Sequence, residues 1–229
     1  MTDTDFVVFG KAEKFRRIPE HVGVIPDGNR RWALGRELDK HEGYAYGVDP
    51  GVRLVERCAQ YGVKEVTFYA FTVDNTKRVS SQIKAYTEAS VKAVSTMANR
   101  DYNIMVVGNQ ESKFFPPELS KYANKRVNYG KGVLNLNFLV NYSWKWDLAH
   151  IEKSGAALGT IEKAIASCDI SRIDLLIRWG GMCRLSGFLP VQSVYADFFI
   201  VEDFWPDYRD EHFLDALRWY QDCDITLGG

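Results

Sequence analysis

A short apolar run changes abruptly to charged residues in the stretch His21-Val-Gly-Val-Ile-Pro-Asp-Gly-Asn-Arg-Arg-Trp32. Apolar residues bounded by glycine and proline are typical of a buried strand. Asp27 and Asn29 are good helix N-caps, and Gly28 allows a ligand to approach the backbone closely. The stretch therefore predicts a strand, a tight turn and the beginning of a helix.

The turn after this strand has the composition of an anion site. Free amide groups at a helix start bind anions, and Arg30 and Arg31 add fixed positive charge. Asp27 adds a carboxylate of the kind that binds Mg²⁺. The alternative is a plain strand-to-helix turn with two solvated arginines, and this stretch alone does not decide between the two interpretations.

The whole chain, residues 1–229, has the composition of a single globular domain. It is 46% hydrophobic and 14% aromatic, and its net charge of −1 gives no indication of nucleic-acid binding. The four cysteines contain no CxxC pair, which argues against a zinc site. Residues 1–6 do not resemble a signal peptide, and no apolar run approaches the roughly 20 residues that span a bilayer. We therefore expect a cytoplasmic protein without stable membrane insertion.

Strand-like and helix-like segments alternate along the chain, and the strand-like ones are apolar nearly throughout, as in parallel strands covered on both faces. The predicted strands are Val22–Ile25, Glu65–Phe71, Ile104–Val107, Leu134–Asn141, Ile173–Ile177 and Phe198–Val201. The predicted helices are Asp49–Tyr61 (with Asp49 as N-cap), Gln82–Arg100, Pro116–Val127, Trp146–Ser167 and Glu211–Asp222. We predict an α/β fold: a single domain with a mostly parallel central sheet of about six strands flanked by helices.

Polar residues follow several of these strands, and ligands of parallel sheets bind at the carboxyl ends of the strands. The residues that follow the first, second and fifth strands include Asp27, Asn29, Arg30, Arg31, Thr72, Asn75, Arg78, Arg178, Arg184 and Ser186. Several arginines at one rim predict a receptor for one or two diphosphates. The alternative for each arginine is a salt bridge with one of the chain's 30 acids.

Three common nucleotide and metal motifs are absent from the sequence. It contains no GxxxxGK[ST] loop, no GxGxxG after the first strand and no DDxxD run. The four histidines show no metal-ligand spacing, and His21 begins a strand, which suits a structural role. These absences argue against nucleotide binding of the P-loop or dinucleotide type.

Four segments carry a resemblance to a known family: His21–Trp32, Tyr69-Ala-Phe-Thr-Val-Asp-Asn-Thr-Lys-Arg78, Asp174–Ser186 and Phe204-Trp-Pro-Asp-Tyr208. In this order they resemble the signatures of the cis-prenyltransferases, the Z-type isoprenyl diphosphate synthases. The second segment is similar to the one usually written YAFSxENWxR. The resemblance covers the chain from His21 to Gly229 and implies that fold, a prenyl-transfer activity in isoprenoid biosynthesis, Mg²⁺ as cofactor and a homodimer.

The resemblance also implies roles for individual residues. Asp27 would hold Mg²⁺ on the diphosphate of the allylic donor. The remaining implied donor-site residues are Gly28, Asn29, Arg31 and Lys40, with Arg30, Trp32 and Tyr44 as further substrate-binding candidates. The second diphosphate would be bound by Arg178, Arg184 and Ser186, while Thr72, Asn75 and Arg78 would lie beside the reacting carbons. Asp197 replaces a glutamate linked to the second metal or diphosphate site.

Several positions depart from the family pattern. Arg30 replaces a glycine, Tyr44 a histidine, Trp179 a threonine and Met182 an acid, and the tail 225–229 lacks the usual arginine. Phe138–Val140 are bulky where long-chain members often have small residues, so the resemblance implies a short product.

The departures near the second diphosphate site resemble the branching members, the lavandulyl and cyclolavandulyl diphosphate synthases. We therefore expect head-to-middle condensation of two dimethylallyl diphosphates with ring closure, giving a monoterpene diphosphate. One alternative is a regular short-chain cis-prenyl diphosphate synthase that uses isopentenyl diphosphate. Another is a non-catalytic partner subunit of such an enzyme, although retention of the arginines and Asp27 argues against it.

Overall fold

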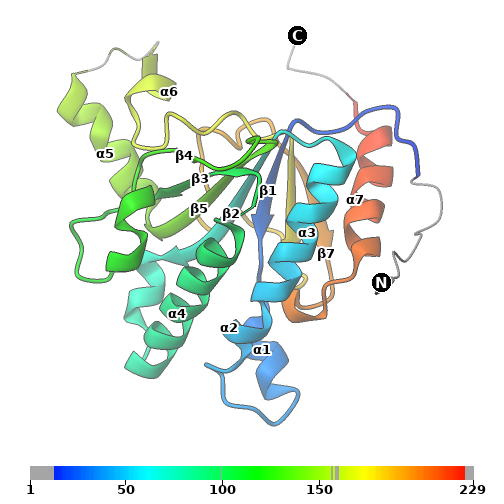
Figure 1. Ribbon diagram of the computed structural model, residues 1–229, viewed down its shortest axis with the longest axis horizontal. Coiled ribbons are helices and arrows are strands. Elements are labelled where there is room, and N and C mark those ends of the chain that lie inside the picture. The colour runs from blue at the N-terminus through cyan, green and yellow to red at the C-terminus, as the bar shows by residue number, and fades with distance from the viewer. Residues whose placement is uncertain (1–12, 99, 156, 158–159, 225–229) are drawn as a thin grey trace, which may run out of the picture.

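The computed structural model describes residues 13–98, 100–155, 157 and 160–224, which form a central β-sheet with helices on both faces (Figure 1). The strands are β1 His21–Ile25, β2 Glu65–Thr72, β3 Tyr102–Val107, β4 Val127–Asn128, β5 Leu134–Tyr142, β6 Leu175–Trp179 and β7 Asp197–Val201. The α-helices are α1 Asn29–Leu34, α2 Gly43–Tyr46, α3 Val48–Tyr61, α4 Ser80–Met97, α5 Trp144–Ser154, α6 Ile161–Ala164 and α7 Asp210–Asp222. Short 3₁₀ segments are η1 Val73–Lys77, η2 Pro117–Tyr122 and η4 Trp205–Asp207.

The sheet has the strand order β4-β3-β5-β2-β1-β6-β7. Neighbouring strands are parallel except for β4, which runs antiparallel to β3. The chain passes from β1 to β2 on one side and later returns to β6 on the other side of β1. Such a switch point opens a crevice at the carboxyl ends of the adjacent strands, here β1 and β6. Figure 1 shows α1 and α2 together at this end of the sheet.

Two apolar clusters cover the two faces of the sheet. One face packs against Leu54 of α3, Val94 of α4 and Phe213 of α7, all fully buried. The opposite face places Leu176 of β6 in a second cluster, against which Trp146 of α5 packs. Within the described ranges no helix combines the length and apolarity needed to cross a membrane.

The α/β architecture and all six predicted strands are confirmed, each end falling within two residues of its predicted position. The two-residue strand β4 is an addition at the edge of the sheet. A run of two residues has too little apolar periodicity to be recognised from sequence.

Three helix predictions need correction. No part of Pro116–Val127 is α-helical: it forms the 3₁₀ segment η2 and then reaches β4. Trp146–Ser167 is split because Gly155 adopts a left-handed conformation, φ 65°, and ends α5. The helix predicted to have Asp49 as its N-cap begins two residues earlier, with Gly47 as N-cap and Asp49 in the first turn. The segments 1–6 and 225–229, discussed above from sequence, lie outside the described residues.

Candidate active site

The loop after β1 holds Asp27 in a fixed orientation at the crevice. Its Oδ1 accepts a hydrogen bond from the backbone N–H of Gly28 at 2.6 Å, and its Oδ2 accepts one from Nη2 of Arg178 at 2.8 Å. Nη2 of Arg31 lies 3.6 Å from the same Oδ2. The side chain of Asp27 is 35% exposed, so the carboxylate is oriented by the protein and still accessible to a ligand.

Gly28 is the N-cap of α1, so the prediction that Asp27 or Asn29 caps this helix is wrong. Gly28 has φ 102°, a conformation that residues with a side chain rarely adopt. A Cβ atom at this position would lie 2.6 Å from Cδ1 of Phe204. Because glycine makes the turn, the carboxylate of Asp27 is left to face Arg178.

Arg178 connects the end of β6 to the segment that follows it. The residue is 3% exposed, and its Nη1 donates to Oγ of Ser186 at 2.9 Å and to the backbone carbonyl of Arg184. With Nη2 on Asp27, this one guanidinium joins the carboxyl ends of β1 and β6. The structure therefore brings together the two arginine-rich segments that the sequence analysis placed at one rim.

Asp27 and Arg184 line a cleft of about 410 Å³, the polar cleft, whereas Arg178 and Ser186 lie behind them and are not part of its lining. Its lining includes Asp27 as the carboxylate and five cationic side chains: Arg30, Arg31, Lys40, Arg78 and Arg184. Excess positive charge in a concave site suits a polyanion such as a diphosphate. Gly28 and Asn29 also line the polar cleft, where backbone amides at the start of α1 add to its anion-binding character.

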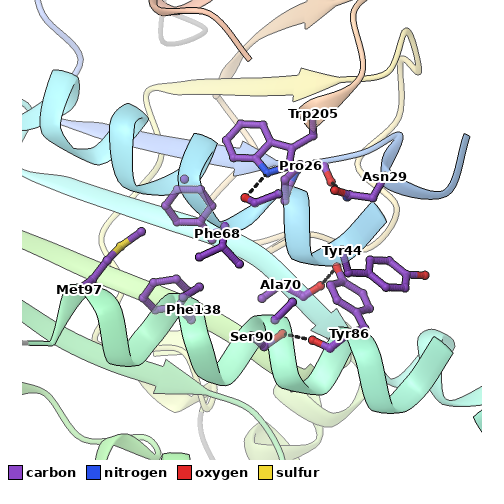
Figure 2. A pocket seen from close by; sticks show the side chains of 15 residues that line it. Pro26, Asn29, Tyr44, Phe68, Ala70, Tyr86, Ser90, Met97, Phe138 and Trp205 are labelled. Carbon is purple, nitrogen blue, oxygen red and sulfur yellow. Dashed lines mark hydrogen bonds between the residues drawn. The ribbon is translucent and has the colours of Figure 1, made fainter. Parts of the chain in front are cut away.

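A second space, the apolar cavity, lies between α4 and the sheet and has a volume of about 60 Å³ (Figure 2). Pro26, Asn29, Tyr44 and Tyr86 line both the cavity and the polar cleft. A single water needs about 10–15 Å³ of such space, so the cavity admits a small apolar group. The two spaces together suit a small molecule with a polyanionic head and a short apolar tail.

Asn29 lies where the two spaces meet. Its Nδ2 donates to the backbone carbonyl of Pro26 at 2.8 Å. Its Oδ1 is buried and has no hydrogen-bond partner among the described residues. Because an unpaired buried acceptor costs about 1–3 kcal/mol, this oxygen is a candidate contact for a ligand or its hydration shell.

Arg78 reaches the same place from the loop after β2. Its Nη1 donates to the hydroxyl of Tyr44 at 2.7 Å. Burial raises the pKa of Tyr44, an effect that the charges of Arg78 and Arg30 oppose in part. Tyr44 is therefore a neutral hydrogen-bond acceptor for Arg78 over the physiological pH range.

Besides Arg178 and Ser186, which bond to each other, and Asp197, three predicted site residues line neither space and make contacts within the fold. The N–H of Thr72 donates to Oδ1 of Asn75 at 2.8 Å, and together they form the capping box of η1. Nε1 of Trp32 donates to Oδ1 of Asp207 at 2.8 Å, and its ring lies against Tyr46. Their expected positions beside a substrate stay a prediction.

Asp197 lies toward the opposite end of the sheet from Asp27. It begins β7 in register with Leu175, whereas Arg178 is in register with Ile25. At about 3.3 Å per residue, the intervening three residues separate these levels by about 10 Å. Burial raises the pKa of Asp197. The expectation that Asp197 joins the metal or diphosphate site is therefore corrected: within one chain it does not share a metal ion with Asp27.

Asp27 is the carboxylate that fits Mg²⁺, the metal implied by the family resemblance. The described residues contain no group of three or more His, Cys, Asp or Glu side chains that could hold a metal ion. Mg²⁺ needs no such cage, because it is commonly held by one or two carboxylates together with substrate phosphates and waters. A single accessible carboxylate beside a cationic cleft matches that donor set.

Several residues of the apolar cavity were missed from the sequence, above all Tyr86 and Trp205. They come from the middle of α4 and from η4, where an aromatic residue looks like any core residue. Phe138, predicted to narrow the space for a chain, does line the cavity, but Leu139 and Val140 do not. Leu139 belongs to the other apolar cluster, because successive strand residues point to opposite faces.

Comparison with known proteins gives one consistent set of relatives. A family model described as "Putative undecaprenyl diphosphate synthase" matches residues 25–228. An isoprenyl transferase of Heliobacterium mobile is 32% identical over 232 residues, covering 93% of this chain and 88% of that protein. A ditrans,polycis-undecaprenyl-diphosphate synthase of Pseudomonas putida, described as (2E,6E)-farnesyl-diphosphate specific, is 31% identical and covers 87% of this chain and 86% of its own length.

A solved structure supports the same fold. Lavandulyl diphosphate synthase from Lavandula x intermedia, in complex with dimethylallyl diphosphate, superposes with a TM-score of 0.77 at 23% sequence identity. The match covers 92% of this chain and 98% of that chain.

Proposed function

This chain belongs to the cis-prenyltransferase family, and from that premise we propose that it joins two dimethylallyl diphosphates head to middle and closes the product into a ring. The product would be cyclolavandulyl diphosphate, with lavandulyl diphosphate as intermediate or by-product. Membership of the family supports a prenyl diphosphate synthase activity. The substrate pair, the ring closure and a working homodimer are our proposal.

The size of the apolar cavity is the observation that carries the proposal. A space of about 60 Å³ lined almost wholly by apolar side chains suits a short allylic chain. The (2E,6E)-farnesyl chain named for the Pseudomonas putida relative is three times as long as a dimethylallyl chain. Phe68 and Phe138, which stack at 5.6 Å between ring centroids, are two bulky side chains in the lining of this space.

On the donor side the residues of the polar cleft act on a leaving diphosphate. The bond between the allylic carbon and oxygen breaks, and the electron pair leaves with the diphosphate. Arg30, Arg31 and Lys40 line the cleft where this charge collects. A Mg²⁺ ion held by Asp27 would add Lewis-acid stabilisation. A unit charge pair at 4 Å is worth about 1 kcal/mol in water and about 4 kcal/mol at an effective dielectric of 20, so these cations act most strongly once the ligand excludes water.

On the acceptor side Arg178, Arg184 and Ser186 would hold the second diphosphate. The internal double bond of this molecule attacks the allylic cation, forming one carbon–carbon bond and a tertiary cation, which loses a proton or is rerouted into the ring. Thr72 and Asn75 are engaged with each other, and Asp197 is distant. The departing diphosphate is therefore our proposed proton acceptor, and the balance is two substrates to one ten-carbon diphosphate plus inorganic diphosphate.

Incubation of the purified chain with dimethylallyl diphosphate and Mg²⁺ alone, followed by product analysis, tests the proposal. We expect a branched or cyclic ten-carbon diphosphate. A linear product formed only after isopentenyl diphosphate is added would instead identify a regular short-chain cis-prenyl diphosphate synthase. No product from either substrate mixture would favour the non-catalytic partner subunit.

A further inference from the structure

Two tyrosines stand at the boundary between the polar cleft and the apolar cavity. Tyr44 of α2 and Tyr86 of α4 stack with ring centroids 4.5 Å apart and an interplanar angle of 7°. Both side chains line both spaces. In Figure 2 the ring of Tyr86 lies between Ala70 and the ring of Tyr44, and so on the cavity side of the pair.

The boundary between the two spaces is where the reacting carbon of a bound allylic diphosphate would lie. With the diphosphate among the cations of the polar cleft and the tail in the apolar cavity, the carbon that joins head to tail must lie where the two spaces meet. The residues shared by the two spaces are Pro26, Asn29, Tyr44 and Tyr86. None of the four carries a formal charge at neutral pH, since burial raises the pKa of both tyrosines.

We propose that Tyr86, backed by Tyr44, is a catalytic residue that stabilises the allylic cation through the π face of its ring. The inference rests on the proposed function in one respect, because it takes the ligand to be an allylic diphosphate that ionises. When the carbon–oxygen bond breaks, positive charge spreads over the allylic carbons, and an aromatic face attracts that charge without forming a bond.

The surroundings of Tyr86 hold its ring at this boundary. Its hydroxyl donates to the backbone carbonyl of Ala70 on β2, and the rings of Phe71 and Tyr86 form a T-shaped pair at 5.5 Å between centroids. The next cavity-lining residues along this face of α4 are small, Ala89, Ser90 and Ala93. Tyr86 is thus the only aromatic side chain that α4 contributes to the lining of the apolar cavity.

The positive charge of Arg78 opposes the stabilisation of an allylic cation at the ring of Tyr86. Its guanidinium carbon lies 5.6 Å from the ring centroid of Tyr86 and 6.0 Å from that of Tyr44. This cation also lines the polar cleft, where the leaving diphosphate would neutralise it at the moment the allylic charge forms. Asn29 adds an unpaired Oδ1 at the same boundary, a dipole that favours positive charge.

The test compares the binding affinities of a cation, tetramethylammonium, and a neutral molecule of similar size, tert-butanol. Both are titrated by calorimetry in the presence of inorganic diphosphate. In Tyr86→Phe, which keeps the ring, we expect tetramethylammonium affinity within about threefold of the unaltered protein. In Tyr86→Leu we expect it to fall about tenfold, the equivalent of about 1.4 kcal/mol and within the range of a desolvated cation–π contact. The affinity for tert-butanol should be similar in all three proteins.

Turnover provides the second readout. In Tyr86→Leu we expect kcat with dimethylallyl diphosphate to fall about tenfold or more with KM nearly unchanged, whereas Tyr86→Phe should retain most of kcat. Tyr129→Leu is the matched control, because Tyr129 pairs with Tyr122 through hydroxyls 3.0 Å apart and lines neither space. Thermal unfolding checks that each variant folds, and Tyr86→Met replaces Tyr86→Leu if the latter does not.

Equal loss of both probes in Tyr86→Leu would overturn the inference, because that result identifies a shape effect. Loss of tetramethylammonium binding in Tyr86→Phe as well would also overturn it, since the ring would then not be the active group. The probe titrations need no turnover. Failure of the protein to convert dimethylallyl diphosphate therefore contradicts the proposed function, while the probe selectivity independently decides the role of Tyr86.

Discussion

The ion pair between Asp27 and Arg178 organises the site at the scale of single residues. Arg178 is buried, and it reaches Asp27 with Nη2 while Nη1 contacts Ser186 and the carbonyl of Arg184. The pair orients the carboxylate and also keeps the guanidinium from being buried without a counter-charge. Function and stability are therefore coupled at Asp27.

We expect Asp27→Asn to lower turnover of dimethylallyl diphosphate by about 10²–10³-fold, because the carboxylate that would hold Mg²⁺ is lost. The free energy of unfolding should fall by about 1–3 kcal/mol, since Arg178 loses its charged partner in a buried position. Diphosphate release and urea denaturation measure the two effects.

Asp74→Asn is the matched control, because Asp74 is an exposed acid whose ion pair with Lys77 contributes only about 0–1 kcal/mol. Near-normal turnover in Asp27→Asn would remove Asp27 from the mechanism.

At the scale of elements, the turn between β1 and α1 depends on Gly28. We expect Gly28→Ala to destabilise the fold through both its backbone and its contact with Phe204. Gly62→Ala separates these contributions, because Gly62 also has a positive φ, 84°, but a Cβ there would meet nothing within 4 Å.

In urea denaturation Gly62→Ala should cost about 1–2 kcal/mol from backbone strain alone. Gly28→Ala should cost about 1–3 kcal/mol more, from overpacking against Phe204. It should also lower turnover, since α1 would shift. Equal costs for the two variants would show that the contact with Phe204 is unimportant.

A buried polar network links the amino ends of the central strands. Nε2 of His21 lies 2.8 Å from Oγ1 of Thr67, and Nδ2 of Asn137 donates to Thr67 at 2.9 Å and to Glu65 at 2.6 Å. Nδ1 of His21 lies 3.0 Å from the carbonyl of Ser171. Burial lowers the pKa of His21, an effect that the charge of Glu65 opposes in part.

This shift predicts a pH dependence of stability. The unfolded chain binds a proton at His21 near pH 6.5, whereas the folded chain resists it, so stability is fully present above about pH 6.5 and falls as the pH decreases below it. Urea denaturation between pH 5 and 8 measures the slope. His21→Gln should flatten it between pH 5.5 and 7, and an unchanged slope would assign the effect to other groups.

At the scale of the whole molecule, β7 is the outermost strand beside β6, and exposed apolar residues lie next to it. Val194 and Tyr195 are 65% and 59% exposed. Apolar side chains gathered at a sheet edge are commonly covered by another chain. Since the proposal includes a homodimer, we expect this edge to contribute to its interface.

Analytical ultracentrifugation should give a mass about twice the chain mass of 26.2 kDa. The double variant Val194→Asp, Tyr195→Glu should shift the mass to that of one chain, while Val133→Asp, at an exposed position outside this edge, should not. A dimer that persists in the double variant would place the interface elsewhere.

The sequence predicted more of the polar cleft than of the apolar cavity. Asp27, Arg31, Arg178 and Arg184 were predicted together because strand ends in a parallel sheet converge. Thr72, Asn75 and Trp32 were predicted by motif and line neither space, because each is held in a local cap or ring contact. Asp197 was misplaced because its position depends on the register of β7, which no local pattern encodes.

Local patterns along the chain were enough to predict the alternation of strands and helices, the tight turn after β1, the concentration of arginines at strand ends and the family. These properties are local, or depend only on the order of elements. Which side chains share a space depends on packing between elements and could be read only from the folded chain. Tyr86 of α4, Phe138 of β5 and Trp205 of η4 meet around one apolar cavity because the helices and the sheet pack together across long sequence separations. The boundary between the polar cleft and that cavity, where we place the reacting carbon, exists only after that packing.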